Sequence, residues 1–390
     1  MNEQGTSIRT PIESAAPAES AARTDGISLA CHEGAVPAAI EAALPALYGN
    51  IHSTLAHLRI YGGLDQVTHT YVARRHGNII AVFLFRLDGD VIRVINEGMQ
   101  VGDHEIDRFA GYVFAKWRWV KVIIFHAIES TIRMPAYLCQ RYVCTANIVL
   151  PLPSTADAYV ASLGKNMRRN LRRYMDKLKR AHPSFRFDVF EREGADERHV
   201  RELLNLNRAR ITGKNKAFAI DDEEEKIIAL VKETGLVGVA TIDGQVMGGA
   251  VGYLVGDCYH FKIIAHDPKY NDYSAGILSC YLMICECIRR GCREYNFMWN
   301  EYEYKFALGA FSRGLEHVVI YRSRLQFLLH PWLAGGVAIS RYRRQVYALL
   351  DKAGPHEDLG RGTRLAIDAL NALRNAKKSA KKLFGHSQTN

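Results

Sequence analysis

The Asp243-Gly244 dipeptide constrains the fold of this chain more than any other feature of its sequence. It separates two apolar runs, Val237–Ile242 and Val246–Leu254. Asp-Gly between apolar runs is the strongest short-range signal for a β-hairpin. A third run, Asp257–His266, is expected to add another strand. The sequence therefore predicts an antiparallel sheet in this region.

An amphipathic segment and a further strand follow these three strands. Ser274–Arg290 places Ile277 and Tyr281 at helical spacing on one side, and Gly291 ends the segment. Glu294–Trp299 then indicates a strand. Three antiparallel strands, a helix and another strand make an α+β fold, with a mixed and mostly antiparallel sheet flanked by helices.

The N-terminal half carries a second set of similar signals. Residues 71–85 indicate two strands joined at a Gly-Asn turn, and residues 91–95 a third. A helix is expected over 103–119 and a strand over 120–126. A chain of 390 residues is too long for one ordinary core, so two compact lobes are expected.

Composition and punctuation divide the chain into four parts. The first is rich in Ala, Ser, Pro and Glu and is expected to be a disordered tail. Pro151 and Pro153 mark a boundary, after which a long basic helix is predicted over 155–181. The predicted parts are residues 1–27 (tail), 28–150 (first lobe), 151–322 (second lobe) and 323–390 (basic helical C-terminal extension).

The net charge of +10 is concentrated in two segments. Between Gly164 and Arg180 eight Lys and Arg face Asp176 alone, and residues 321–390 carry a net charge of +9. Such segments attract phosphate groups on a nucleotide-like cofactor, an anionic lipid surface or nucleic acid. For the first segment, a solvated helix face is an equal alternative.

Other classes of protein are disfavoured by composition. Hydrophobic residues make up 48% of the chain, yet no run reaches the length of a membrane-spanning helix, and the start lacks the apolar core of a secretory signal. The eight cysteines form no C-x-x-C pair, so we expect no metal site and reduced thiols in a cytoplasmic protein.

The most informative stretch joins a strand end to a helix start, from His266 to Ile277. Ser274, Ala275 and Gly276 make a small-residue turn that lets a pyrophosphate approach the unpaired N–H groups of the helix. Any helix can begin after such a turn, so this signal gains weight only from its neighbours.

Those neighbours complete a family pattern. The matching segments are His266–Tyr270, Tyr273–Leu278, Arg289–Phe297, Tyr304-Lys305, Leu308–Ala310 and the basic Leu163–Arg173. Together they resemble the CelD-like branch of the GNAT superfamily, which in turn resembles the FemAB aminoacyltransferases. The resemblance covers about residues 150–322. Two departures are Asn296, where the family has Asp, and Ala275, where Pro is commoner; Asn296 cannot act as a base.

The resemblance implies tandem GNAT-like lobes, a degenerate one over 28–150 and a catalytic one over 151–322. It also implies an N-acyltransferase that moves an acyl group from acyl-CoA or acyl carrier protein to an amine. Acyl-CoA would then be a co-substrate, with no permanently bound cofactor. Aminoacyl-tRNA remains a third donor within the resemblance.

Thioester aminolysis suggests a role for each candidate residue. His266 would be the base, Tyr304 would donate to the departing sulfur, and Lys305 would stabilise an oxyanion or a cofactor phosphate; each has a structural alternative. The donor-binding set comprises Ser274, Ala275, Gly276, Ile277, Arg168 and Arg172.

Two non-enzymatic functions compete with this interpretation. The basic segment 164–180 would suit nucleic acid, although no nucleic-acid-binding signature accompanies it. The C-terminal extension would suit a catalytically inactive scaffold on an anionic membrane. If the enzyme itself lies peripherally on the inner face of the membrane, a lipid or cell-envelope precursor becomes an attractive acceptor.

Overall fold

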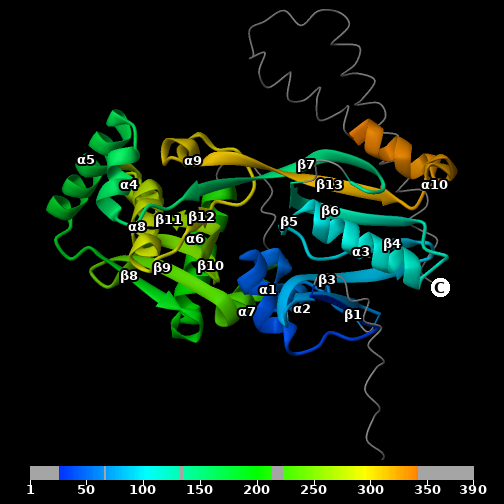
Figure 1. The fold of residues 1–390 in the computed structure, drawn as a ribbon. Helices are drawn as coiled ribbons and strands as arrows, with labels where there is room; N and C mark the ends of the chain where they lie inside the picture. Colours follow the sequence, from blue (N-terminus) through cyan, green and yellow to red (C-terminus); the bar gives the residue numbers. More distant parts are fainter. Residues whose placement is uncertain (1–25, 66, 132–134, 213–222, 341–390) are drawn as a thin grey trace, which may run out of the picture.

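The computed structural model describes residues 26–340, apart from residues 66, 132–134 and 213–222. Two lobes lie side by side, and one sheet runs through both of them (Figure 1). The strand order along this sheet is β1-β2-β3-β4-β6-β13-β7-β12-β11-β10-β9-β8. The predicted α+β fold with a mixed sheet and flanking helices is confirmed.

The N-terminal lobe is built around four antiparallel strands and one parallel neighbour. Strands β1 to β4 pair antiparallel in order, and β4 pairs parallel with β6. Their bounds are β1 Ile27–His32, β2 His69–Arg75, β3 Asn78–Asp88, β4 Val91–Val94, β5 Gln100–Val101 and β6 Val122–Ser130. The helical elements are α1 Ile40–Tyr48, η1 Ile51–Ser53, α2 Leu55–Ile60 and α3 Asp103–Lys116.

The C-terminal lobe repeats this order. Strands β8 to β11 pair antiparallel, and β11 pairs parallel with β12. Their bounds are β8 Arg186–Glu191, β9 Gly235–Ile242, β10 Gln245–Val255, β11 Cys258–His266 and β12 Glu294–Asn296. The helical elements are α4 Ala156–Ser162, α5 Lys165–Ala181, η2 Arg192–Gly194, α6 Glu197–Thr212, α7 Glu224–Thr234, η4 Pro268–Tyr273, α8 Ala275–Arg289 and α9 Glu303–Ala307.

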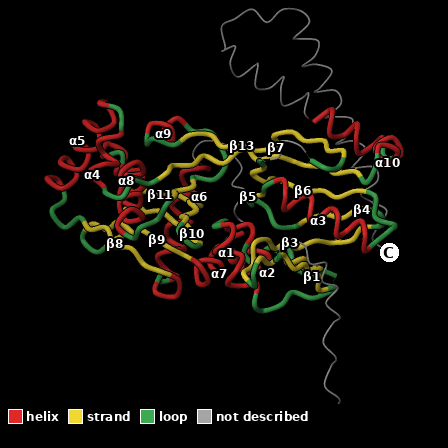
Figure 2. The backbone as a smooth tube through the Cα atoms, in the orientation of Figure 1, coloured by secondary structure: helices red, strands yellow, loops and turns green. Residues whose placement is uncertain are grey.

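The lobes exchange their last strands. Strand β7 (Leu138–Pro151) follows the N-terminal lobe in sequence but pairs with β12 of the C-terminal lobe. Strand β13 (Phe311–Tyr321) follows the C-terminal lobe but pairs with β6. The two exchanged strands also pair with each other along their length, which carries the sheet across the molecule (Figure 2). The predicted boundary at residue 150 thus falls at the end of a strand that both lobes share.

Helices cover both faces of the C-terminal sheet. Helices α4, α5 and α8 enclose one apolar cluster, which contains Tyr159, Leu171 and Met283. Helices α6 and α7 enclose another on the opposite face, around Leu203 and Ile227. Because these two clusters are buried on opposite faces, the point at which β11 and β12 separate lies between two layers of helices.

The predicted hairpin is confirmed. Asp243 and Gly244 both have positive φ, at 50° and 75°, as a two-residue type I′ turn requires. The single long helix predicted over 155–181 is wrong: Leu163 and Gly164 are extended, and they separate α4 from α5. Residues 1–25 of the predicted tail, and residues 341–390 of the predicted extension, lie outside the described residues.

The beginning of the C-terminal extension is helical. Helix α10 (Arg324–Leu329) is followed by a helical run over 331–340. Within the described ranges, no helix combines the length and apolar character needed to cross a bilayer.

Candidate functional site

The site lies where the parallel strands β11 and β12 separate. They pair at only three positions, Cys258 with Glu294, Tyr259 with Tyr295 and His260 with Asn296. Beyond these pairs β11 continues to His266, whereas β12 ends at Asn296. The space between the diverging segments, which we call the wedge, contains a cavity of about 360 Å³. Residues 261–264 line this cavity on one side and residues 297–300 on the other.

A second cavity, of about 280 Å³, lies at the start of α8. The helix begins at Ala275, directly after Ser274 in the left-handed conformation (φ 51°), and its first turn contains no acidic residue. The lining residues are Arg210, Ile264, His266, Ser274, Gly276, Ile277 and Tyr304. The structure therefore brings five of the predicted site residues together at the positive end of a helix.

Gly276 keeps this cavity open. A Cβ atom at this position would lie 3.2 Å from Nδ1 of His266 and 3.6 Å from Cδ1 of Ile264. Any larger side chain would press on the imidazole and occupy the space beside the helix N-terminus. Ala275 is fully buried and packs into the core beneath the turn.

His266 is held at the mouth of the cavity by a hydrogen bond. Its Nε2 lies 2.8 Å from Oδ1 of Asn271, in the short helical turn that precedes α8. An N–H at Nε2 that donates to this amide oxygen fixes the ring orientation and places the basic lone pair on Nδ1, the nitrogen that faces Gly276.

Tyr304 lines both cavities and so connects them. Its side chain is half-buried at the start of α9, and burial raises the pKa of its phenol far above the ordinary value. The hydroxyl therefore stays protonated at every physiological pH and is available as a hydrogen-bond donor to a group in the wedge.

Lys305 is buried, and its ammonium group is committed to the backbone. Nζ donates to the carbonyl oxygens of Phe297 at 2.9 Å, Trp299 at 2.6 Å and Asn300 at 2.9 Å. These three bonds use all three protons of the charged group. Burial lowers its pKa to about 8. The contacts give Lys305 a clear part in holding the loop after β12, while the predicted contact with an oxyanion or phosphate stays a prediction.

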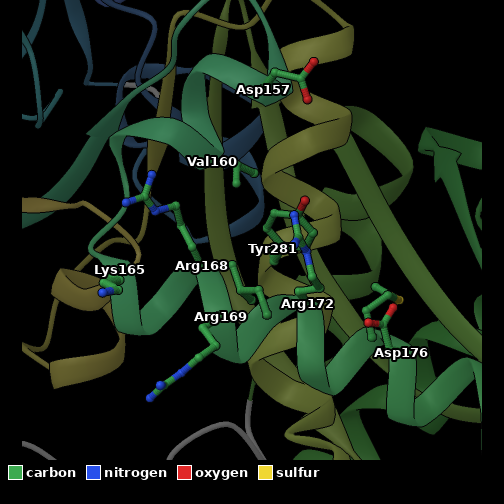
Figure 3. A pocket seen from close by; sticks show the side chains of 10 residues that line it. Asp157, Val160, Lys165, Arg168, Arg169, Arg172, Asp176 and Tyr281 are labelled. Atoms are coloured by element: carbon green, nitrogen blue, oxygen red, sulfur yellow. The ribbon is translucent and has the colours of Figure 1, made fainter.

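Arg168 and Arg172 lie in a different place from the other predicted donor-binding residues. They line a cavity of about 630 Å³ where α4, α5 and α8 meet (Figure 3). Its lining residues are Asp157, Val160, Lys165, Arg168, Arg169, Leu171, Arg172, Met175, Asp176 and Tyr281. None of these lines the cavity at the start of α8, so the structure does not gather the two arginines and the Ser274 turn into one pocket.

Arg210 was missed by the sequence-based predictions. It projects from α6, on the opposite face of the sheet from α8, and lines both wedge cavities beside Tyr304. Nothing in the sequence distinguishes Arg210 from the other cations of its helix, because its position depends on how α6 crosses β11.

The N-terminal lobe also reaches the wedge. The ring of His52 stacks on that of Trp299, with centroids 5.3 Å apart, and its Nδ1 lies 3.2 Å from Nε2 of His57. Burial lowers the pKa of His57 to about 4 and that of His52 well below its ordinary value. Two neutral histidines of one lobe thus support the loop that Lys305 holds in the other.

Metal-binding clusters and the thiols of Cys280 and Cys287 give no alternative catalytic centre among the described residues. No group of three or more His, Cys, Asp or Glu side chains there is placed to hold a metal ion. Burial raises the pKa of the Cys280 thiol to about 12, and that of Cys287 well above its ordinary value, so neither is an activated nucleophile.

Sequence comparison agrees with this geometry. Residues 165–306 match the acetyltransferase (GNAT) domain family. The predicted resemblance to that superfamily is therefore confirmed. No curated protein matches the sequence.

The chain is similar to several solved structures, and one of them, FemX, shows the same fold across most of the chain. The crystal structure of FemX is 10% identical, covers 76% of this chain and 98% of its own, and superposes with a TM-score of 0.53. A protein of unknown function from Bacteroides thetaiotaomicron gives 10% identity, 74% and 98% coverage and a TM-score of 0.48. L-PGS from Bacillus licheniformis gives 13% identity, 78% and 96% coverage and a TM-score of 0.45. At 10% identity, the likeness to FemX establishes the fold alone.

Proposed function

We propose that this protein is an N-acyltransferase that moves an acyl group from a thioester donor to an amine in the C-terminal lobe. The observation that carries the proposal is the meeting of the acid-free N-terminus of α8 with His266 and Tyr304 in one cavity. A helix N-terminus binds phosphate, and both CoA and the phosphopantetheine arm of acyl carrier protein bring phosphate and thioester together.

The proposed reaction assigns one proton transfer to each of two side chains. The amine attacks the thioester carbonyl, and a C–N bond forms as the C–S bond breaks. His266 accepts the proton that the amine loses, and the Tyr304 hydroxyl donates one to the departing sulfur. Backbone N–H groups at Gly276 and Ile277 hold the donor phosphate, while Lys305 keeps the loop after β12 in place.

A test of the donor site uses two glycine substitutions. Gly276→Val should raise the Kd for CoA by about 10-fold or more, because its side chain would occupy the approach to the helix N-terminus. Gly194→Val is the matched control, since a Cβ atom at Gly194 meets nothing within 4 Å. Calorimetry on both folded variants measures the effect. Equal CoA affinity in Gly276→Val and wild type would show that the donor does not bind in this cavity.

An acceptor carried by a lipid or cell-envelope precursor is supported by an exposed apolar surface, which we call the α10 patch. It consists of Leu325, Leu328, Leu329 and Trp332, exposed by 61%, 68%, 61% and 92%. An indole this exposed beside three leucines suits the interfacial region of a bilayer. Vesicle sedimentation followed by acyl transfer to an aminolipid would test peripheral association and acceptor class together.

A further inference from the structure

Helix α5 presents cations that have no ion-pair partner among the described residues. All eight of its Lys and Arg side chains are exposed, and none forms an ion pair with the carboxylates that the structure describes. Elsewhere the pattern differs, since Arg201 and Arg208 of α6 both pair with Glu224. The eight side chains are Lys165, Arg168, Arg169, Arg172, Arg173, Lys177, Lys179 and Arg180.

This cationic face borders the cavity at the start of α8. Tyr174 of α5 is hydrogen-bonded to Ser274, the residue directly before that helix. Nζ of Lys177 donates to the carbonyl oxygen of Asp272 at 3.3 Å and lies over the ring of Tyr273 at 5.0 Å. A macromolecule bound on α5 would therefore lie against the wall of the proposed donor site.

The extent of the face exceeds what a small ligand needs. Its 17 residues span roughly 25 Å at the rise of an α-helix, and cations occur along the whole length. A cavity lined by Arg168, Arg172 and Tyr281 hollows this surface at one side (Figure 3). Such a surface fits a partner whose acidic side chains extend along several turns of α5, with one side chain entering the hollow.

The same helix turns its apolar side chains inward. Leu171 and Leu178 are buried, and Met167, Tyr174 and Met175 pack against the core beneath them. The apolar side chains of α5 are therefore directed to the core, and its one ring, Tyr174, is half-buried, so the outer face offers no fully exposed apolar side chain to a bilayer or a nucleic-acid base. These features favour an acidic protein surface over a membrane or an RNA.

We propose that α5 is the docking surface for an acidic carrier protein that presents the acyl thioester on a phosphopantetheine arm. The inference rests on the proposed function and selects the carrier-bound donor over free acyl-CoA. The carrier lies on α5, the phosphate of its arm reaches the N-terminus of α8, and the thioester enters the wedge beside Tyr304. Acyl transfer then leaves the arm as a free thiol on the carrier.

The experiment measures binding of a fluorescently labelled holo-acyl carrier protein by anisotropy. The double variant Arg169→Glu/Lys179→Glu should raise its Kd by about 30-fold or more, because two attractive charges become repulsive. The control Arg75→Glu/Arg118→Glu makes the same charge change at exposed positions of the N-terminal lobe and should stay within about 3-fold of wild type. Raising the salt concentration should weaken wild-type binding.

Catalysis provides a second measurement. The same acyl group is supplied once on the carrier and once on CoA. The kcat/KM for the carrier-bound donor, divided by the kcat/KM for the CoA-bound donor, should fall in the α5 variant by about the factor by which the Kd for the carrier rises. This ratio should not change in the control. Equal carrier affinity in wild type and the α5 variant overturns the proposal. So does an RNA duplex that binds wild type more tightly than the carrier and shows the same sensitivity to the α5 variant.

The two levels of inference fail in different ways. Carrier binding that depends on α5, together with no acyl transfer from any thioester, would retain the docking surface and remove the proposed function. Transfer from acyl-CoA alone, with no carrier binding, would retain the function and remove the docking surface.

Discussion

The two lobes share one strand order, but the donor site that we propose lies in the C-terminal lobe alone. In both lobes the parallel pair of strands is joined at three positions, β4 with β6 and β11 with β12. In the N-terminal lobe, however, β5 pairs with β6 farther along, at Gln100 and Val101. A short strand thus occupies a region that corresponds to the open wedge of the other lobe.

The helix that connects the two parallel strands also differs between the lobes. Helix α3 has Asp103 and Glu105 in its first turn, whereas the first turn of α8 has no acid. Carboxylates at a helix N-terminus satisfy its positive end and repel a phosphate. The lobes therefore share a framework but differ in the charge of this helix start, and we expect only the start without acids to accept an anion.

The largest expected effect tests whether chemistry belongs to the C-terminal lobe alone. Tyr304→Phe keeps the ring and removes the hydroxyl, so it should lower kcat by about 100-fold if the phenol protonates the leaving sulfur. Tyr112→Phe on α3 makes the same change in the N-terminal lobe and should leave kcat within about 2-fold. Steady-state kinetics with a donor that the wild-type protein uses measures both variants. A kcat of Tyr304→Phe equal to that of wild type would show that the Tyr304 hydroxyl takes no part in the mechanism.

The next effect concerns how the N-terminal lobe supports the wedge. His57 has a pKa of about 4 in the folded protein against 6.5 ordinarily, so the unfolded chain binds its proton first as the pH falls. Its contribution to stability is complete above pH 6.5 and is lost progressively down to about pH 4.

The loss between pH 7.5 and 5 should be about 2 kcal/mol from this residue. Urea unfolding of wild type and His57→Gln at the two pH values measures it. The variant should lose less stability than wild type on acidification. An identical loss in both proteins would mean that His57 is protonated in the folded state, contrary to its burial.

A third substitution converts one helix start into the other. Ile277 occupies the third position of α8, as Glu105 does in α3. Ile277→Glu should raise the Kd for CoA by about 10-fold through repulsion of the phosphate. Ile277→Gln has the same size without the charge and serves as the control. If the Glu and Gln variants bind CoA equally, charge at this helix start does not distinguish the lobes.

The smallest effect concerns surfaces rather than sites. The N-terminal half of the sheet carries the α10 patch, through contacts of Phe327 and Leu333 with β6 and β13, whereas the C-terminal lobe carries the basic face of α5. Trp332→Ser should weaken binding to anionic vesicles by about 3-fold or more, since one exposed indole is lost. Sedimentation of this variant beside Arg169→Glu assigns membrane contact to one surface or the other.

The parts of the fold predicted from sequence are those set by local chemistry. The Asp243-Gly244 turn, the start of α8 after Ser274 and the sheet strands beside them follow from neighbouring residues. The break between α4 and α5 was missed because the apolar spacing continues across Leu163 and Gly164. Strand exchange was missed because β12 has only three residues and its partners lie far away in sequence.

The site residues divide in the same way, into those that local sequence predicts and those that depend on distant contacts. His266, Gly276 and Tyr304 lie in motifs with recognisable spacing, and the structure brings them together. Arg210 reaches the wedge across the sheet, and His52 reaches it from the other lobe. Neither position is encoded in a local pattern, because each depends on the packing of segments that are distant in sequence.

The exchange of β7 and β13 has a consequence for synthesis. As the chain leaves the ribosome, the N-terminal lobe emerges first, but the strand that completes its sheet beside β6 ends at Tyr321. Until that residue has been translated, β6 has an open hydrogen-bonding edge. Domains that complete their own sheets fold as they emerge, one after another. In this protein the sheet of the first lobe is completed only after the second lobe has been translated, so we expect the nascent chain to be most prone to aggregation in that interval.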